Sequence, residues 1–84
     1  MAERVIFSAE ARADIRAIDR ETALRVLKAL ARFLLTSTGN VKQLEGFDPQ
    51  QYRLRVGDWR VIFRKSGADT IEVVHVRNRR EAYR

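Results

Sequence analysis

The stretch YRLRVGDWRVIFR, Tyr52 to Arg64, alternates apolar and cationic side chains on both sides of a Gly-Asp pair. A period of two predicts β-strands with one face in the core and one face outside it. A two-residue loop of this composition predicts a tight hairpin turn, which fixes the register of both strands. The stretch therefore predicts an antiparallel hairpin that turns at Gly57 and Asp58.

Counting back from the turn assigns the hairpin side chains to two faces. The pairs expected on the core face are Val56 with Trp59, Leu54 with Val61, and Tyr52 with Phe63. The pairs expected on the other face are Arg55 with Arg60, Arg53 with Ile62, and Gln51 with Arg64. Like charges directly opposite each other destabilise a sheet, so folding alone gives no reason to place Arg55 across from Arg60.

These arginines suggest a site for an anion. A guanidinium presents several donors in a planar fork that fits phosphate oxygens, and a sheet face holds neighbouring forks in fixed positions. We interpret Arg53, Arg55 and Arg60 as a candidate phosphate clamp. The alternative is that they are three solvated arginines on an exposed sheet face.

The rest of the chain predicts one strand and two helices before this hairpin, and a strand after it. RVIFS, residues 4–8, is a short β-branched and aromatic run that predicts the first strand. Ser8 is the expected N-cap of a short helix, and Asp19 is the expected N-cap of a longer helix over about residues 20–37. TIEVVHV, residues 70–76, predicts the last strand.

The longer helix has an apolar stripe wider than one contact surface needs. Leu24, Ala31 and Leu35 extend the stripe beyond the residues that one neighbouring layer would cover. Either this helix is buried from two sides, which is the commoner arrangement, or it offers apolar area to a partner.

Gly39 is expected to end the longer helix. NVKQLEGFDPQQ, residues 40–51, carries Gly, Asn and Pro signals and predicts an irregular connection whose Leu44 and Phe47 pack back onto the core. The expected fold is a single α+β domain over residues 1–84, in the order β-α-α-β-β-β with a short C-terminal helical turn. Two sequential hairpins predict an antiparallel sheet with both helices on one face.

The positive charge is concentrated in the second part of the chain. The net charge is +6, and residues 51–84 carry nine Lys or Arg against four Asp or Glu, whereas residues 1–50 carry eight against seven. Such an imbalance favours a polyanionic partner, first nucleic acid and then an acidic protein.

Several classes of protein are excluded by the composition. The chain has no cysteine and a single histidine, His75, so neither a disulfide framework nor a thiolate metal site is possible, and no metal or other cofactor is expected. Neither a signal peptide nor a membrane-spanning stretch is recognisable, so we expect a cytoplasmic protein that does not engage a membrane.

The C-terminal segment RNRREAYR supplies more cations and an aromatic ring directly after the last predicted strand. Three of its arginines, Arg77, Arg79 and Arg80, come shortly before Tyr83. Tyrosine combines a platform for stacking on a base with a hydroxyl that can exchange a proton. This segment is therefore expected to fold over the open face of the sheet.

Taken together, YRLRVGDWRVIFR, the following β-branched strand and RNRREAYR closely resemble the RelE/ParE superfamily of toxins from type II toxin–antitoxin pairs. The resemblance spans nearly the whole chain. It implies a RelE-like ribosome-dependent endoribonuclease that cuts messenger RNA in the A site. In that family the 2′-hydroxyl of a nucleotide attacks its own 3′ phosphate without a metal, which leaves a cyclic phosphate and a 5′-hydroxyl.

The resemblance also implies roles for single residues. The residues that match the catalytic positions of the family are Arg53, Arg55, Arg60, Arg79 and Tyr83. The residues expected to bind RNA or the ribosome are Arg64, Arg77 and Arg80. Arginine stays protonated at neutral pH, so Tyr83 is the candidate for proton transfer.

This sequence departs from the family pattern where many relatives have a histidine before the post-strand arginine, since that position is Asn78 here. His75 lies within the last strand and is expected to pack or to form hydrogen bonds rather than to catalyse. Two other functions stay open: a ParE-like inhibitor of DNA gyrase without nuclease activity, and a non-toxic RNA-binding module.

The resemblance finally implies partners. We expect a cognate antitoxin encoded in the same operon, through which the toxin–antitoxin complex would bind operator DNA. The ribosome and its messenger RNA are the expected targets.

Overall fold

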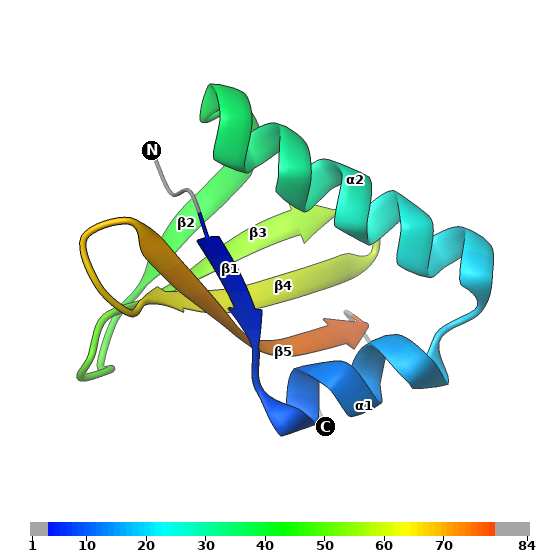
Figure 1. Ribbon diagram of the computed structural model, residues 1–84, viewed down its shortest axis with the longest axis horizontal. Coiled ribbons are helices and arrows are strands. Elements are labelled where there is room, and N and C mark those ends of the chain that lie inside the picture. Colours follow the sequence, from blue (N-terminus) through cyan, green and yellow to red (C-terminus); the bar gives the residue numbers. More distant parts are fainter. Residues whose placement is uncertain (1–3, 79–84) are drawn as a thin grey trace.

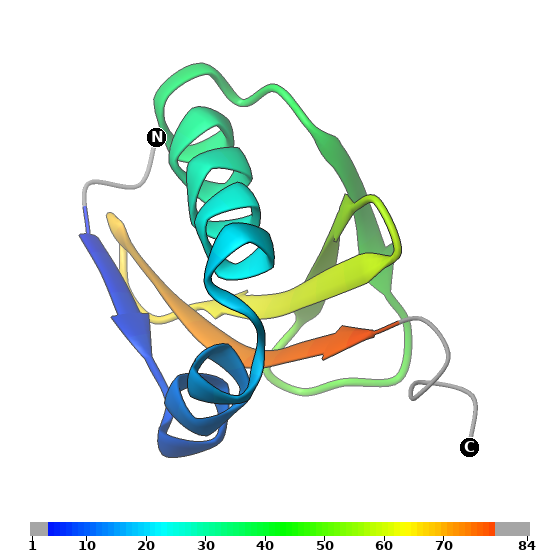
Figure 2. The same cartoon turned by 90° about the vertical axis from the view of Figure 1, so that its right-hand side faces the viewer.

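The structure is a computed structural model that describes residues 4–78 (Figure 1). Its elements, in chain order, are β1 (Arg4–Phe7), α1 (Ala9–Ala17), α2 (Arg20–Thr36), β2 (Asn40–Leu44), β3 (Gln51–Val56), β4 (Trp59–Lys65) and β5 (Thr70–Asn78). The strands form one five-stranded sheet in the order β1-β5-β4-β3-β2. Helix α2 runs across one face of this sheet, and α1 lies beside β5 (Figures 1 and 2).

The register predicted for the central hairpin is confirmed at every pair. Val56 lies opposite Trp59 and Arg55 lies opposite Arg60, and the pairing continues without a shift to Gln51 and Arg64. The reason is local, because a two-residue turn leaves no freedom to slip and the alternation then assigns every side chain to a face.

The sheet is mixed rather than wholly antiparallel, which corrects the prediction for the first strand. β1 pairs in parallel with β5, with Arg4 opposite Thr70 and Phe7 opposite Val73. A parallel pair needs a long connection between its strands, and here both helices and three strands separate them. The α+β architecture with two helices over a sheet is as predicted.

A second correction concerns residues 40–51, which were expected to be irregular. Their first part is the edge strand β2, antiparallel to β3, with Val41 opposite Leu54. Polar side chains obscured this strand because they are typical of sheet edges, where they discourage pairing with other chains. Leu44 is half-buried within β2, but the Phe47 ring is 49% exposed and does not pack onto the core.

Both predicted N-caps are confirmed. The Ser8 hydroxyl accepts a hydrogen bond from the Ala11 N–H at 3.0 Å, and Asp19 Oδ2 accepts one from the Thr22 N–H at 3.0 Å. That backbone hydrogen bond from Thr22 lowers the pKa of Asp19. Helix α2 ends at Thr36, where Ser37 rather than Gly39 takes the left-handed conformation of a cap.

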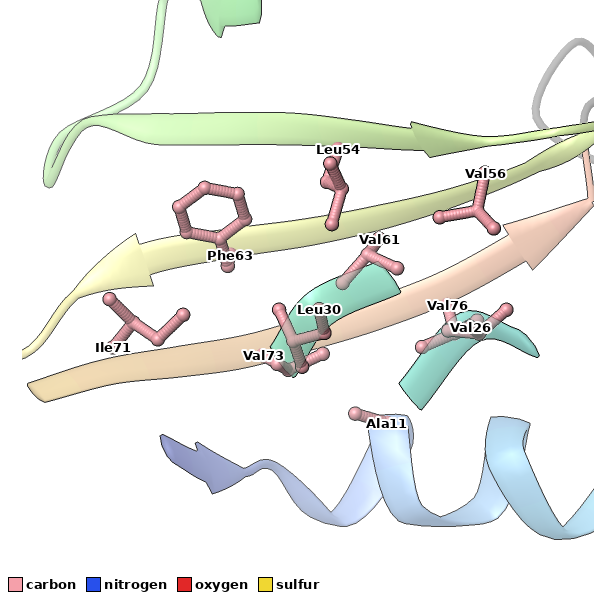
Figure 3. Close-up of a cluster of buried hydrophobic side chains, with 10 residues drawn as sticks. All are labelled: Ala11, Val26, Leu30, Leu54, Val56, Val61, Phe63, Ile71, Val73 and Val76. Carbon is pink, nitrogen blue, oxygen red and sulfur yellow. The ribbon is translucent and has the colours of Figure 1, made fainter. Parts of the chain in front are cut away.

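The core lies between the sheet and the helices. Figure 3 shows its ten buried side chains, which are Ala11, Val26, Leu30, Leu54, Val56, Val61, Phe63, Ile71, Val73 and Val76. Phe63 stacks on Tyr52 with 5.5 Å between ring centroids and meets Phe33 of α2 at the same distance. Because these side chains fill one face of the sheet, the residues between them in β3 and β4 point to the other face.

Helix α1 covers the part of β5 that extends beyond β1. There the Ser8 hydroxyl donates to the Val74 carbonyl at 2.7 Å, and the Val76 N–H donates to Asp14 Oδ2 at 3.0 Å. The backbone groups of an exposed strand edge are therefore satisfied by side chains around α1.

Helix α2 is not buried from two sides, which settles the alternative left open by its wide apolar stripe. Leu24 is 47% exposed, Leu27 is 37% exposed and Leu35 is 69% exposed. Apolar area on the outer side of α2 is therefore available to a partner. Neither helix is long and apolar enough to cross a membrane, within the residues that the structure describes.

Candidate anion-binding site

The arginines of the central hairpin gather on the sheet face that turns away from the core. Leu54 and Val56 of β3 are buried, so Arg53 and Arg55, which alternate with them, emerge on the opposite face. Val61 of β4 is fully buried, which likewise directs Arg60 to that face. Pairing of the two strands then brings the three guanidinium groups onto one patch, which we call the arginine face (Arg53, Arg55 and Arg60).

Arg53 has the most distinctive environment of the three. It lies between Lys42 of β2 and Ile62 of β4, and it is half-buried. Its Nε is buried, and no hydrogen-bond partner for it exists among residues 4–78. A buried donor without an acceptor is costly, so a movement of the Arg53 side chain that brings its guanidinium to an anionic oxygen relieves this cost.

Arg55 and Arg60 belong to a row of cations that crosses three strands. Arg60 lies opposite Arg55 on one side and opposite Arg77 of β5 on the other. The Arg55 Nε donates a long hydrogen bond to the nearby Gly57 carbonyl at 3.4 Å, and Arg55 is exposed. Arg55, Arg60 and Arg77 therefore place positive charge near the C-terminal ends of β3 and β5 and near the start of β4.

Two arginines at the margins of this face have acidic neighbours. Arg64 forms an ion pair with Glu72 of β5, with its Nε at 2.6 Å and its Nη2 at 2.5 Å from Glu72 Oε1. The Arg77 Nε lies 3.8 Å from Asp14 Oδ2. Sequence analysis named both arginines but neither acidic partner.

His75 joins the second of these groups. Its Nδ1 lies 3.3 Å from the Arg77 Nη2 and 3.9 Å from Asp14 Oδ2. This environment agrees with the expected hydrogen-bonding role of His75. Asp14 had no signal in the sequence, since its contacts with β5 join residues more than 60 positions apart.

The other predicted site residues, Arg79, Arg80 and Tyr83, lie outside the residues that the structure describes, as does the predicted C-terminal helical turn. The predicted site residues that the structure describes are Arg53, Arg55, Arg60, Arg64 and Arg77.

The sequence matches a family model described as the ParE toxin of the type II toxin–antitoxin system parDE, over residues 5–83. The chain belongs to this ParE toxin family. No curated protein matches its sequence.

Three solved structures share the fold of this ParE-family toxin. A chain of the RelB-RelE antitoxin-toxin complex from Methanococcus jannaschii has a TM-score of 0.74 and 21% identity, with 93% of this toxin and 94% of that chain covered. The archaeal RelE-RelB complex from Pyrococcus horikoshii OT3 gives 0.72 and 22%, with 94% and 97% covered. The toxin-antitoxin complex RelBE2 from Mycobacterium tuberculosis gives 0.70 and 21%, with 94% and 100% covered. The protein is therefore a toxin of a toxin–antitoxin system with a RelE/ParE fold.

The toxin has a second surface around α2, where exposed leucines border cationic side chains. A hollow of about 310 Å³ between α1, β1 and α2 is lined by Phe7, Ile15 and Leu27, with Arg12 and Arg16 beside them. Farther around α2, Arg25, Lys28 and Arg32 share one side of the helix. This surface combines apolar area with positive charge.

Proposed function

We propose that this toxin is a RelE-like, ribosome-dependent endoribonuclease that cleaves messenger RNA without a metal ion. The observation that carries the proposal is the arginine face, and above all the buried Arg53 Nε that has no acceptor among residues 4–78. A phosphate of the RNA backbone supplies such an acceptor and compensates the repulsion between Arg55 and Arg60.

The first requirement of the proposed reaction is electrostatic stabilisation of its transition state. The 2′-oxygen loses its proton and bonds to the adjacent phosphorus, while the bond from phosphorus to the 5′-oxygen breaks and that oxygen takes up a proton as it leaves. In the pentavalent state between these two events the phosphate oxygens gain negative charge. Guanidinium groups already aimed at that position stabilise the transition state more than the ground state. Arg53, Arg55 and Arg60 fill this role in the proposal, together with Arg79, and Arg77 and Arg80 contact the flanking RNA or the ribosome.

Proton transfer falls to a different side chain. Arginine remains protonated at neutral pH and cannot accept the proton of the 2′-hydroxyl. Tyr83 has a hydroxyl that can take part in proton transfer. In this proposal Tyr83 moves the proton and also offers its ring to a base.

A second candidate is inhibition of DNA gyrase by binding, without nuclease chemistry. The match to a family model described as ParE toxin favours it. Under this alternative the arginine face contacts a protein rather than a scissile phosphate.

One pair of assays separates the two functions. We expect mapping of messenger RNA 5′ ends after toxin induction to give new ends at ribosome A sites, and purified gyrase to keep its supercoiling activity in the presence of the toxin. Arg53→Gln removes the charge at the buried Nε and should abolish the new ends. Arg32→Gln, on the outer side of α2, is the matched control and should leave them intact. Growth arrest with gyrase inhibition and no new RNA ends would favour the second candidate.

We further propose that a cognate antitoxin, encoded in the same operon, covers the α2 surface and links the complex to operator DNA. The solved relatives are complexes between RelE and RelB proteins. Leu24, Leu27 and Leu35 offer apolar area, and the cations beside them select an acidic partner. An amphipathic antitoxin segment with acidic side chains, ordering as it binds, meets both requirements.

A further inference from the structure

Glu72 is an acidic side chain on the same side of the sheet as the arginine face. Both Nε and Nη2 of Arg64 lie within 2.6 Å of Glu72 Oε1. The Glu72 side chain is only 19% exposed, and that of Arg64 is 38% exposed. The pair is therefore partly shielded from solvent and holds a guanidinium by two of its donors.

A β-bulge places Glu72 at this position. Ile62 pairs with His75, and a constant register would then bring Val73 opposite Arg64. The register instead shifts between Ile62 and Phe63, so that Arg64 lies opposite Glu72. Bulges re-aim side chains beside functional sites, and this one exchanges an apolar neighbour of Arg64 for a carboxylate.

Arg64 extends the row of cations along β4. It follows Arg60 by four residues on the same strand, which corresponds to about 13 Å and to the same face of the sheet. Without Glu72 it would be the next phosphate contact for an RNA backbone that runs along β4. With Glu72 the pair carries no net charge, and a phosphate that approaches Arg64 also approaches a carboxylate.

We propose that Glu72 is a specificity-determining residue that excludes Arg64 from RNA contact and so limits how far the bound backbone extends along β4 beyond Arg60. This inference rests on the proposed function. In this proposal Arg64 does not bind RNA, contrary to the expectation from the sequence. The Arg64–Glu72 pair has no net charge and marks the end of the RNA-binding surface along β4.

The test measures binding of the purified full chain to a fluorescent single-stranded RNA dodecamer of uridine as the salt concentration rises. Glu72→Gln keeps the shape of the side chain and frees one positive charge. It should tighten binding at low salt and steepen the plot of log affinity against log salt by about 0.7, the contribution of one additional phosphate contact on a single strand. The melting temperature of each variant checks that the sheet is intact.

Two further variants separate the effect of charge next to Arg64 from the effect of the net charge of the protein. Glu21→Gln, in the first turn of α2 on the other side of the sheet, adds the same charge and should leave the slope of the wild-type protein unchanged. Arg64→Gln with Glu72→Gln removes the pair and should also restore that slope. Equal slopes for Glu72→Gln and Glu21→Gln, in a protein that binds the RNA, would overturn only the role of Glu72. Salt-independent binding by the wild-type protein, or no binding either to the dodecamer or to purified ribosomes, would overturn the proposed function as well.

Discussion

Arg55 of β3 lies directly opposite Arg60 of β4, and Arg60 lies opposite Arg77 of β5, so three arginines stand side by side across the ladder. Cross-strand pairs of like charge destabilise a sheet, whereas pairs of opposite charge stabilise it. This arrangement is therefore unfavourable for the sheet itself, and in the proposed function an anionic ligand offsets the cost.

This cost predicts opposite effects on stability and activity. Arg55→Thr relieves repulsion with Arg60 and keeps a residue that favours strands, so the free energy of unfolding should stay constant or rise by up to about 0.5 kcal/mol. Messenger RNA cleavage should fall. Thermal unfolding and a ribosome cleavage assay measure the two effects on one preparation. A loss of stability that parallels the loss of cleavage would mean that Arg55 supports the fold rather than the reaction.

Tyr83 can be tested by removing a single oxygen atom. Tyr83→Phe keeps the ring, so ribosome binding should persist. The cleavage rate should fall by roughly two to four orders of magnitude if the hydroxyl moves the proton. Tyr83→Ala should weaken binding in addition. Cleavage by Tyr83→Phe at the wild-type rate would assign proton transfer to another group and leave Tyr83 as a stacking platform.

The α2 surface predicts how antitoxin binding can be lost while the toxin stays folded. Leu35 is 69% exposed, so Leu35→Lys should hardly change the melting temperature. Burial of one leucine in an interface is worth about 1.5–3 kcal/mol, which corresponds to a loss of affinity of roughly tenfold to a hundredfold. Isothermal titration with the purified antitoxin measures this loss, and Thr36→Lys adds the same charge as a control.

Equal losses for Leu35→Lys and Thr36→Lys would show that charge alone acts, and would place the antitoxin elsewhere on the toxin.

The N-cap of α2 predicts a pH dependence of stability. The pKa of Asp19 in the folded protein is lowered from its ordinary value of 3.8, chiefly by the backbone hydrogen bond from Thr22. Its contribution is therefore complete above the unfolded pKa and is lost as the pH falls through the folded pKa, in the acidic range below about 4. Asp19→Asn keeps the acceptor and should flatten the dependence of melting temperature on pH there. Asp19→Ala should lower the melting temperature at neutral pH as well. If the melting temperature of Asp19→Asn falls at acidic pH as steeply as that of the wild-type protein, the pH dependence comes from other carboxylates.

The local features of this fold were accessible from the sequence. The register of β3 and β4 follows from a two-residue turn, and the helix starts follow from Ser8 and Asp19. Each depends on residues close together in the chain, where spacing and side-chain chemistry leave few alternatives. The arginines of the central hairpin could be assigned to one face for the same reason.

The features that sequence analysis missed depend on contacts between distant segments. The sequence of β2 resembles a polar loop because only alternate side chains of an edge strand pack against the core. In β2 the main one is Val41. Glu72 meets Arg64 only because a bulge shifts the register of β5, and no residue in the sequence marks that bulge. Asp14 reaches β5 across the whole fold. The RNA-binding role of Arg64 was predicted without knowledge of Glu72, and it stays a prediction that the Glu72 variants test.

The parallel pairing of β1 with β5 also sets an order of events during synthesis. Arg4 and Thr70 are partners in the finished sheet, although almost the entire chain separates them. Contacts of such sequence separation form slowly and late, because a long loop must close first. Strand β5, the last in chain order among residues 4–78, thus completes both the core and the row from Arg55 to Arg77. A newly made toxin molecule cannot present the row from Arg55 to Arg77 before β5 has emerged from the ribosome.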